Sequence, residues 1–307
     1  MKGKHITSIL DLSTEEINQI LKVAETLKLE RMQRIPHPIL AGRNLAMIFE
    51  KPSTRTRISF EVGINQLGGS ALYLSSKDMQ LGRGETIADT AKVLSRYVDC
   101  IMARVFSHNT IKELAENATV PVINGLSDYE HPCQVLADVF TMYEKFGELK
   151  GLKLAYIGDG NNMANSLLYV CAKLGMHMSV ASPGGYMPKD EVLAEANKIA
   201  AKTGSKLTVG TDPIEAVKGA HAVYTDVWIS MGDEAEKEER LAKFQPFQVN
   251  SKLMQHVDPD AIVLHCLPAH RGEEITNEVI DGPQSAVWDE AENRLHVQKA
   301  IMTLITR

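Results

Sequence analysis

The stretch NLAMIFEKPSTRTRISFEVG, residues 44–63, joins an apolar run to a helical pattern through a short polar turn. The run at 44–49 has the length and composition of a buried strand, and Phe60, Ile64 and Leu67 recur at the spacing of one helix face. Later strands are predicted at residues 71–74, 98–103, 120–123, 152–157, 178–181, 207–209, 221–225, 262–264 and 286–288. Helical patterns fill the gaps between them, and such alternation favours parallel sheets, so the predicted fold class is α/β.

The chain is long enough for two domains. Its 307 residues exceed the length at which a single hydrophobic core usually stops growing. Gly147 and Gly151 separate a helical pattern at 131–146 from the strand at 152–157, which marks the expected boundary. We therefore expect two doubly wound parallel-sheet domains. Open parallel sheets bind ligands at the carboxyl ends of their strands, so residues that follow strands are the candidates for a site.

Composition argues against several kinds of partner. A net charge of −6 gives no general attraction to nucleic acid, and no run of about 18 apolar residues predicts a membrane span. The amino-terminal segment has neither the apolar core of a signal peptide nor the composition of a transit peptide, so we expect a cytoplasmic protein. The cysteines form no CxxC pair, and His131, His265 and His270 lack zinc-ligand spacing, so neither a metal nor an organic cofactor is expected. The charged run at 233–240 is expected to be a solvated loop or helix face.

The turn at residues 53–57 has the composition of an anion site. It opens a helix, where free N–H groups and the helix dipole attract negative charge. Hydroxyl groups and the guanidinium groups of Arg55 and Arg57 add hydrogen bonds that suit a phosphate. From these residues alone an alternative has comparable weight, in which Ser53 only caps the helix and the arginines pair with surface carboxylates.

Two further turns follow strands of the first half. Arg104 comes directly after the strand at 98–103, and the motif HPCQ at 131–134 follows the strand at 120–123. Proline suits the first turn of a helix, and His131 and Gln134 are spaced so that both can point toward a ligand at the helix start. Taken alone, HPCQ is also compatible with an ordinary capped helix.

The second half contains a turn, GDGNNM at 158–163, that superficially resembles a dinucleotide-binding fingerprint. Met163 occupies the position of its third glycine, and the next strand is not followed by the acidic residue that would bind a ribose. Asn161 and Asn162 instead place amides at a helix start, where an amino-acid carboxylate could bind.

A carboxylate follows the strand at 221–225. Asp226 can hold the α-ammonium group of an amino acid, and Ser230 with backbone amides near Met231 can hold its other polar groups. The second half therefore favours an amino-acid ligand.

Four motifs together resemble one enzyme family. They are STRTR at 53–57, MARVFSH at 102–108, HPCQ at 131–134 and HCLPAHRG at 265–272. Their order over essentially the whole chain is similar to that of the aspartate/ornithine carbamoyltransferases, and most similar to that of the ornithine members. The resemblance implies a carbamoyl-phosphate-binding domain at 1–147, joined by a C-terminal helix at 290–307, an ornithine-binding domain at 148–289, and an active site in the cleft between them. It implies transfer of the carbamoyl group of carbamoyl phosphate to the δ-amine of L-ornithine, giving L-citrulline and phosphate, in arginine biosynthesis or in the arginine deiminase pathway.

The resemblance also assigns residues to the site. The positions implied to bind carbamoyl phosphate are Ser53, Thr54, Arg55, Thr56, Gln80, Arg104, His131, Pro132, Cys133, Gln134, Cys266, Leu267 and Arg294. Those implied to bind ornithine are Asn162, Asp226, Ser230 and Met231. Catalytic roles are implied for Arg55, Arg104, His131, Asp226 and Cys266. In this family the loop that contains Gln80 reaches a neighbouring subunit, which implies a homo-oligomer, a trimer, whose sites are completed across subunits.

The implied chemistry is direct transfer. The neutral δ-amine attacks the carbamoyl carbon and phosphate leaves, while cationic and neutral donors stabilise the negative charge. No thioester on Cys266 is expected, because carbamoyl phosphate is already activated. Asp226, Cys266 or the departing phosphate could accept the amine proton, and the sequence leaves these three open.

Three alternatives stand beside this reading. A carbamoyltransferase for putrescine or N-acetylornithine is the nearest, although Asp226 and the motif SMG at 230–232 favour an acceptor with a free amino-acid head group. A nicotinamide dehydrogenase would require the incomplete fingerprint at 158–163 to function. A phosphate sensor without catalysis would not require the motifs at 230–232 and 265–272.

Overall fold

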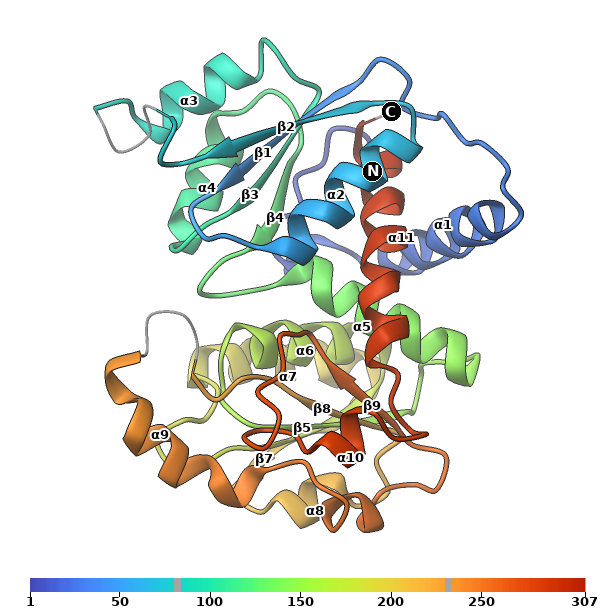
Figure 1. The fold of residues 1–307 in the computed structure, drawn as a ribbon, viewed down its shortest axis with the longest axis vertical. Helices are drawn as coiled ribbons and strands as arrows, with labels where there is room; N and C mark the ends of the chain where they lie inside the picture. Colours follow the sequence, from blue (N-terminus) through green and yellow to red (C-terminus); the bar gives the residue numbers. More distant parts are fainter. Residues whose placement is uncertain (80–83, 230–233, 307) are drawn as a thin grey trace. The chain divides into compact units, whose positions relative to one another are not determined.

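The computed structural model describes residues 1–79, 84–229 and 234–306, which form two compact units (Figure 1). Unit 1 is Met1–Ala137 with Glu292–Arg307, and unit 2 is Asp138–Ala291. The divisions fall inside helices α5 (Pro132–Phe146) and α11 (Val287–Thr306), so each helix contributes to both units. The boundary predicted at Gly147 lies just after the end of α5. A glycine indicates where helix α5 ends. The division between the units falls earlier, inside α5, because it depends on which unit each turn of the helix packs against.

Unit 1 is built on a parallel sheet with the strand order β2-β1-β3-β4 in the described residues. The strands are β1 (Asn44–Phe49), β2 (Ser70–Ser75), β3 (Cys100–Arg104) and β4 (Val122–Leu126). Its helices, besides parts of α5 and α11, are η1 (Ile9–Asp11), α1 (Thr14–Met32), α2 (Thr54–Gln66), α3 (Ile87–Leu94) and α4 (His108–Asn117). The predicted passage from strand to turn to helix at residues 44–63 is confirmed.

Helices cover the sheet of unit 1. An apolar cluster joins Ala46, Ile101 and Val122 of the strands to Ala91 of α3 and Ile111 of α4. Helix α2 packs closely against α11 at Gly63. A Cβ atom added at this glycine would lie only 3.2 Å from the Met302 side chain of α11. Figure 1 shows α2 and α11 beside one another in this unit.

A buried lysine holds the last helix in the core of unit 1. Lys299 of α11 is fully buried, and its Nζ donates to Gln66 Oε1 at 3.0 Å and lies 2.9 Å from His37 Nε2. Burial lowers the pKa of Lys299 to about 8. These contacts tie α11 to the end of α2 and to the segment after α1, so the carboxyl-terminal helix belongs to the fold of unit 1.

Unit 2 contains a second parallel sheet, whose strand order in the described residues is β7-β6-β5-β8-β9. The strands are β5 (Lys153–Ile157), β6 (His177–Ala181), β7 (Leu207–Gly210), β8 (Ala222–Thr225) and β9 (Ile262–His265). The helices are α6 (Asn162–Leu174), α7 (Asp190–Thr203), α8 (Pro213–Val217), η2 (Glu234–Glu236), α9 (Lys237–Phe244), η3 (Gln245–Phe247), η4 (Leu253–His256) and α10 (Asn277–Ile280). Both units are therefore α/β, as predicted.

One predicted strand is wrong. Residues 286–288 do not form a strand, because Val287 begins α11. The preceding Ser285 makes only an isolated bridge to Val263, and the Ala286 N–H donates to the Val263 carbonyl at 2.9 Å. The short apolar run pairs briefly with β9 and then turns into a helix, whose first turn contains Asp289 and Glu290.

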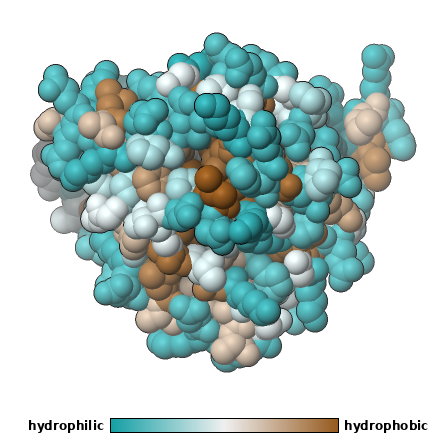
Figure 2. All heavy atoms as spheres, turned by 90° about the horizontal axis from the view of Figure 1, so that it is seen from below, coloured by the Kyte–Doolittle hydropathy of each residue, from teal (hydrophilic) through white to brown (hydrophobic). Residues whose placement is uncertain are grey.

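Much of the surface is hydrophilic (Figure 2). Hydrophilic side chains predominate on the face in Figure 2, and hydrophobic ones form small separated groups. None of the helices in the described ranges combines the length and apolarity needed to cross a bilayer.

Candidate active site

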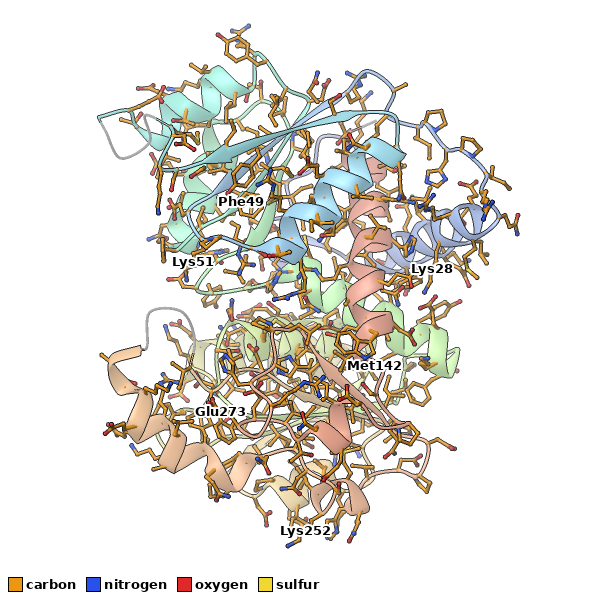
Figure 3. All side chains as sticks on the ribbon, in the orientation of Figure 1. Lys28, Phe49, Lys51, Met142, Lys252 and Glu273 are labelled. Atoms are coloured by element: carbon orange, nitrogen blue, oxygen red, sulfur yellow. The ribbon has the colours of Figure 1, made fainter. Side chains whose placement is uncertain are left out.

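In unit 1, three turns that carry predicted site residues lie at one edge of the sheet. Strand β1 leads into α2 through the turn that contains Ser53, and Figure 3 labels Phe49 at the end of the strand and Lys51 in the turn. Strand β3 ends at Arg104, and β4 leads to His131 at the start of α5. Because β1, β3 and β4 are neighbours and parallel, their carboxyl ends meet at the same edge.

Hydrogen bonds join residues from all three turns and from α11. Arg294 donates to Gln134 Oε1 at 2.9 Å and to Thr56 Oγ1 at 3.1 Å. Arg104 donates to the same Thr56 oxygen at 3.4 Å. All four side chains are buried. The structure thus brings together residues that lie up to 238 positions apart in the chain.

His131 lies among three arginines. Its ring is buried, and the pKa of His131 is lowered well below its ordinary value by burial first and then by the charges of Arg294, Arg104 and Arg55. The imidazole is therefore neutral near pH 7 and can donate one hydrogen bond without adding a further cation. Three guanidinium groups and the starts of two helices make the electrostatic potential here strongly positive, although the net charge of the protein is negative.

The turn at 53–57 contains a helix cap and two arginines in different environments. Ser53 is the N-cap of α2, and its hydroxyl accepts from the Thr56 N–H at 3.2 Å. Arg57 pairs with Glu61 at 3.4 Å, so the capping alternative describes these two residues well. Arg55 is half-buried and pairs with no carboxylate within the described ranges. Thr54 is exposed at the start of the helix.

The rest of the HPCQ motif supports the turn. Pro132 begins α5, and Cys133 is buried with its Sγ 3.5 Å from the Asn124 carbonyl of β4. Burial raises the pKa of Cys133 to about 12, so its thiol stays protonated. The buried Glu130 accepts from the Ile9 N–H at 2.9 Å and from the Ser8 hydroxyl, which ties the amino-terminal segment to the residue before His131.

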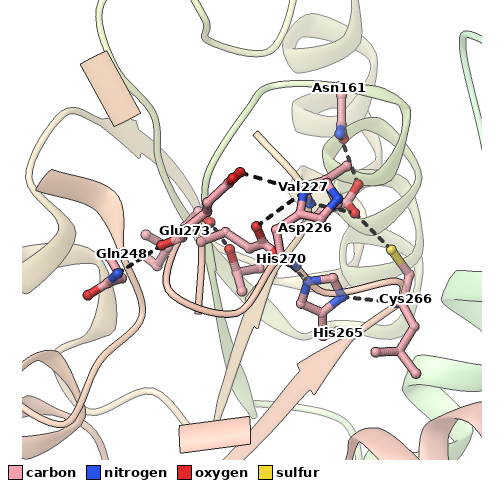
Figure 4. Close-up of polar contacts among 12 residues, drawn as sticks. Asn161, Asp226, Val227, Gln248, His265, Cys266, His270 and Glu273 are labelled. Carbon is pink, nitrogen blue, oxygen red and sulfur yellow. Dashed lines mark hydrogen bonds and ion pairs between the residues drawn. The ribbon is translucent and has the colours of Figure 1, made fainter. Parts of the chain in front are cut away.

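In unit 2, the corresponding edge carries a buried carboxylate with several donors. Asp226 follows β8, Asn161 follows β5 and Cys266 follows β9, and these strands are neighbours. Asp226 accepts from Asn161 Nδ2 at 3.0 Å, from Cys266 Sγ at 3.0 Å and from the Val227 N–H at 2.8 Å (Figure 4). The carboxylate is fixed in orientation, as a group that must meet a substrate cation would need to be.

The sequence placed Asn161 beside a possible carboxylate site, but the resemblance gave it no role, and its contact with Asp226 was not predicted. Its Oδ1 caps α6 by accepting from the Met163 N–H at 2.9 Å, and this leaves its amide nitrogen to hold Asp226. The predicted ligand-binding residue, Asn162, is the first residue of α6. The sequence motif contained both asparagines, but spacing alone did not distinguish the cap from the residue beside it.

The Cys266 thiol is held in its protonated form. The pKa of Cys266 is raised well above its ordinary value, by burial first and then by the negative charge of Asp226. A protonated thiol that donates to a carboxylate is a poor nucleophile and a poor proton acceptor. This state agrees with the expectation that no thioester forms.

Buried groups behind Cys266 orient the turn that contains it. The Leu267 N–H donates to His265 Nδ1 at 2.9 Å, so the other ring nitrogen carries the hydrogen and donates to Glu274 Oε1 at 2.9 Å. The His265 N–H donates to Glu290 Oε2 at 2.8 Å. Leu267 itself has a φ of 57°, a left-handed conformation that costs energy for a branched side chain. Sequence reasoning missed Glu274 and Glu290, since nothing in their local pattern marks them as buried.

Gln80, Ser230 and Met231 lie outside the described residues.

Two groups of side chains have donor atoms close enough to hold a cation. Among the described residues, the ligand atoms of Asp226, His265 and Cys266 lie within 4.8 Å of one another, as do those of His270, Glu273 and Glu274. Sequence spacing did not predict either group. In the first group both ring nitrogens of His265 already make hydrogen bonds, to Leu267 and Glu274, so a cation there would have to displace one of them.

Comparisons with known proteins match both units of the chain. Residues 4–144 match the family model described as the aspartate/ornithine carbamoyltransferase carbamoyl-P binding domain. Residues 150–305 match the corresponding Asp/Orn binding domain.

Individual relatives match over nearly the whole chain. The ornithine carbamoyltransferase of Bacillus subtilis is 59% identical over 303 residues, covering 99% of this chain and 94% of the relative. That of Thermococcus kodakarensis is 57% identical over 305 residues, covering 99% and 97%. The solved structure of ornithine carbamoyltransferase from Pyrococcus furiosus superposes with a TM-score of 0.97 at 56% identity, covering 99% of this chain and 97% of that one.

Proposed function

Because this chain belongs to the aspartate/ornithine carbamoyltransferase family, we propose that it transfers the carbamoyl group of carbamoyl phosphate to the δ-amine of L-ornithine. The products are L-citrulline and phosphate. The observation that carries the proposal is that unit 1 contains a cationic site and unit 2 contains an oriented carboxylate, Asp226. The first suits an anionic carbamoyl donor, and the second suits the ammonium group of an amino acid.

Carbamoyl phosphate is assigned to the arginine cluster of unit 1. Its phosphate oxygens are anionic acceptors, and Arg55, Arg104 and Arg294 with the start of α2 supply charged and backbone donors. The remaining residues assigned to this substrate are Ser53, Thr54, Thr56, Gln80, His131, Pro132, Cys133, Gln134, Cys266 and Leu267. The hydrogen bonds among Thr56, Gln134 and Arg294 support the assignment, because they orient the donors before the substrate arrives.

Ornithine is assigned to the edge of the sheet in unit 2. Asp226 binds its α-ammonium group, and Asn162, Ser230 and Met231 bind its other polar atoms. The three donors around Asp226 support this role, since they fix the carboxylate in place.

The proposed reaction forms one bond and breaks another. The neutral δ-nitrogen of ornithine attacks the carbamoyl carbon to form a C–N bond, and the bond from that carbon to the phosphate oxygen breaks. Neutral His131 and the arginines donate to the oxygen atoms on which negative charge grows. The amine proton passes to Asp226 or to the departing phosphate, because the raised pKa of Cys266 makes its thiol unsuitable as an acceptor. Carbamoyl phosphate is already activated, so this chemistry requires neither a metal nor an organic cofactor.

The assay that tests this proposal measures phosphate release from carbamoyl phosphate with parallel acceptors. L-Ornithine should give a kcat/KM at least about 100-fold above those of putrescine, N-acetylornithine and L-aspartate. Putrescine lacks the α-carboxylate, N-acetylornithine lacks the charged α-ammonium group that would pair with the buried Asp226, and L-aspartate has no δ-amine to attack the carbamoyl carbon. Turnover with another acceptor alone would overturn the assignment of unit 2 and leave that of unit 1 intact. Phosphate binding without turnover of any acceptor would favour a sensor.

We also propose that the protein assembles as a trimer in which Gln80 completes the site of a neighbouring copy. An apolar surface supports this proposal, because Ile58 and Val62 of α2 and Leu72 and Tyr73 of the edge strand β2 are exposed in the isolated chain. A second copy would cover this surface and the open edge of the sheet.

Mixing two inactive variants tests the shared site. Each proposed site takes Gln80 from one chain and Arg55 from its neighbour. In a mixed trimer of Gln80→Ala and Arg55→Ala chains, some sites receive the intact residue from each chain. Subunit exchange between the two inactive variants should therefore restore part of the activity. Light scattering should report the mass of three chains. A monomeric mass, or no recovery after exchange has been verified with a labelled subunit, would contradict the shared site.

A reducing, cytoplasmic setting completes the proposal. It is supported by the free state of the cysteines at 100, 133, 171 and 266. Recovery of the activity with membranes after cell fractionation would contradict it.

A further inference from the structure

One arginine of the charged run at 233–240 is buried. Residues 235–239 are exposed, as the sequence predicted for a solvated helix face, but Arg240 of α9 is only 8% exposed. Lys and Arg side chains are seldom buried to this degree without partners. The prediction for the run is therefore wrong at this position.

The partners of Arg240 come from separate parts of unit 2. Its Nη1 donates to Asp159 Oδ2 at 2.9 Å and to the Trp228 carbonyl oxygen at 3.0 Å. Its Nε donates to Glu236 Oε2 at 3.1 Å, and its guanidinium carbon lies 4.8 Å from the centre of the Tyr186 ring. Asp159 and Trp228 are themselves buried, so the ion pair and the carbonyl contact are shielded from water.

Two of these partners lie in the turns that carry the amino-acid site. Asp159 is two residues before Asn161 in the turn after β5, and Trp228 is two residues after Asp226 in the segment after β8. The contact between Asn161 Nδ2 and Asp226 Oδ2 bridges the same two turns. Arg240 thus joins the turns at one place and the Asn161–Asp226 hydrogen bond joins them at another.

We propose that Arg240 is a positioning residue for the amino-acid substrate: by bonding to Asp159 and to the Trp228 carbonyl it fixes the relative placement of Asn161 and Asp226, and so sets the affinity for ornithine. The proposal rests on the function proposed above, in which Asp226 binds the α-ammonium group. Arg240 does not contact Asp226 directly, so its effect is exerted through the backbone of the two turns.

Steady-state kinetics of Arg240→Met test the proposal. The KM for ornithine should rise at least about tenfold, whereas the KM for carbamoyl phosphate, whose assigned arginines lie in unit 1, should change less than about twofold. Asp159→Asn should likewise raise the KM for ornithine and leave the KM for carbamoyl phosphate nearly unchanged. The double variant should be no worse than the more affected single one, because both substitutions break the same contact.

The matched control is Lys243→Met. Lys243 lies on the same helix, near the same Tyr186 ring at 5.1 Å, but it pairs only with the exposed Glu239 among the described residues, at 2.6 Å. Its removal should leave both KM values unchanged. Equal effects at Lys243 and Arg240 would show that α9 acts through its general charge and would overturn the proposal.

Arg240→Lys keeps the inference testable if the methionine variant does not fold. A lysine at this position retains the charge, but it lacks the Nε–H that donates to Glu236 and the rigid guanidinium plane that directs Nη1 at Asp159 and the Trp228 carbonyl. We expect a selective rise of several-fold in the KM for ornithine. A folded Arg240→Lys or Arg240→Met variant with an unchanged KM for ornithine would refute the positioning role. Failure of the wild-type protein to turn over ornithine would instead refute the proposed function.

Discussion

Arg55→Ala is expected to lower kcat/KM for carbamoyl phosphate by about 10²–10³-fold, the usual cost of losing one preorganised donor to a developing negative charge. Arg55 lies in the first turn of α2, and its charge acts on His131 together with those of Arg104 and Arg294. It pairs with no carboxylate in the part of the chain that the structure describes, so its guanidinium group is available to a ligand. It is only half-buried, and the variant should therefore fold.

The measurement compares kinetics at saturating ornithine with the binding of inorganic phosphate by calorimetry. Arg43→Ala is the matched control. Arg43 directly precedes β1, at the opposite end of the strand that leads to Arg55, and it pairs with Asp99 at 2.6 Å on the surface. Loss of such a surface pair costs at most about 1 kcal/mol of stability and should leave the kinetics unchanged. An Arg55→Ala enzyme with kcat/KM within tenfold of the wild-type value would remove Arg55 from the site.

Asp226→Asn is expected to reduce kcat/KM for ornithine by about 100-fold or more, since a hydrogen-bonded charge pair with the substrate contributes roughly 1.5–3 kcal/mol or more. The substitution removes the charge and also replaces the oxygen that accepts from Asn161 with a nitrogen that can only donate. Cys266, Val227 and Asn161 all donate to this carboxylate. The oxygen of an asparagine can face Cys266 and Val227, but its amide nitrogen then faces the amide nitrogen of Asn161. Asn161 cannot turn over to offer its oxygen, because that oxygen caps α6.

The binding of the phosphate group should be unaffected by Asp226→Asn, because the residues assigned to that group around His131 belong to unit 1. Calorimetry with phosphate tests this directly. Asp281→Asn provides a control of the same chemistry in unit 2, at an exposed aspartate whose partner is Arg271 on the surface. The role of Asp226 would be rejected if ornithine kinetics stayed within tenfold of wild type while the control behaved as expected.

Periodicity predicted the repeating elements well because buried strands and helix faces leave their spacing in the sequence. The unit from β1 to α2 lies where the pattern at 44–63 indicated. The same rule failed at 286–288, because so short an apolar run shows no periodicity. Residues 287 and 288 instead lie in the first turn of α11. Local patterns identified the turns after β1, β3, β4 and β8 as candidate sites, since position after a parallel strand is itself a sequence feature.

The supporting residues could not be predicted in this way. Glu274, Glu290 and Arg240 are buried charged residues in stretches that look solvated, and their partners are distant in sequence or lie across a turn. Which member of a charged run is buried depends on tertiary packing, which periodicity does not report. The resemblance to known enzymes supplied roles for individual residues, but it assigned none to Asn161, whose contact with Asp226 appears only in three dimensions.

The return of α11 to unit 1 has a consequence for the order in which the protein is made. Residues 138–291 leave the ribosome before Arg294, so a nascent chain can complete the sheet of unit 2 while unit 1 still lacks its last helix. Thr56 and Gln134 must wait for a partner that is synthesised 238 and 160 positions later. The growing chain can therefore assemble the described groups around Asp226 before the arginine cluster around His131.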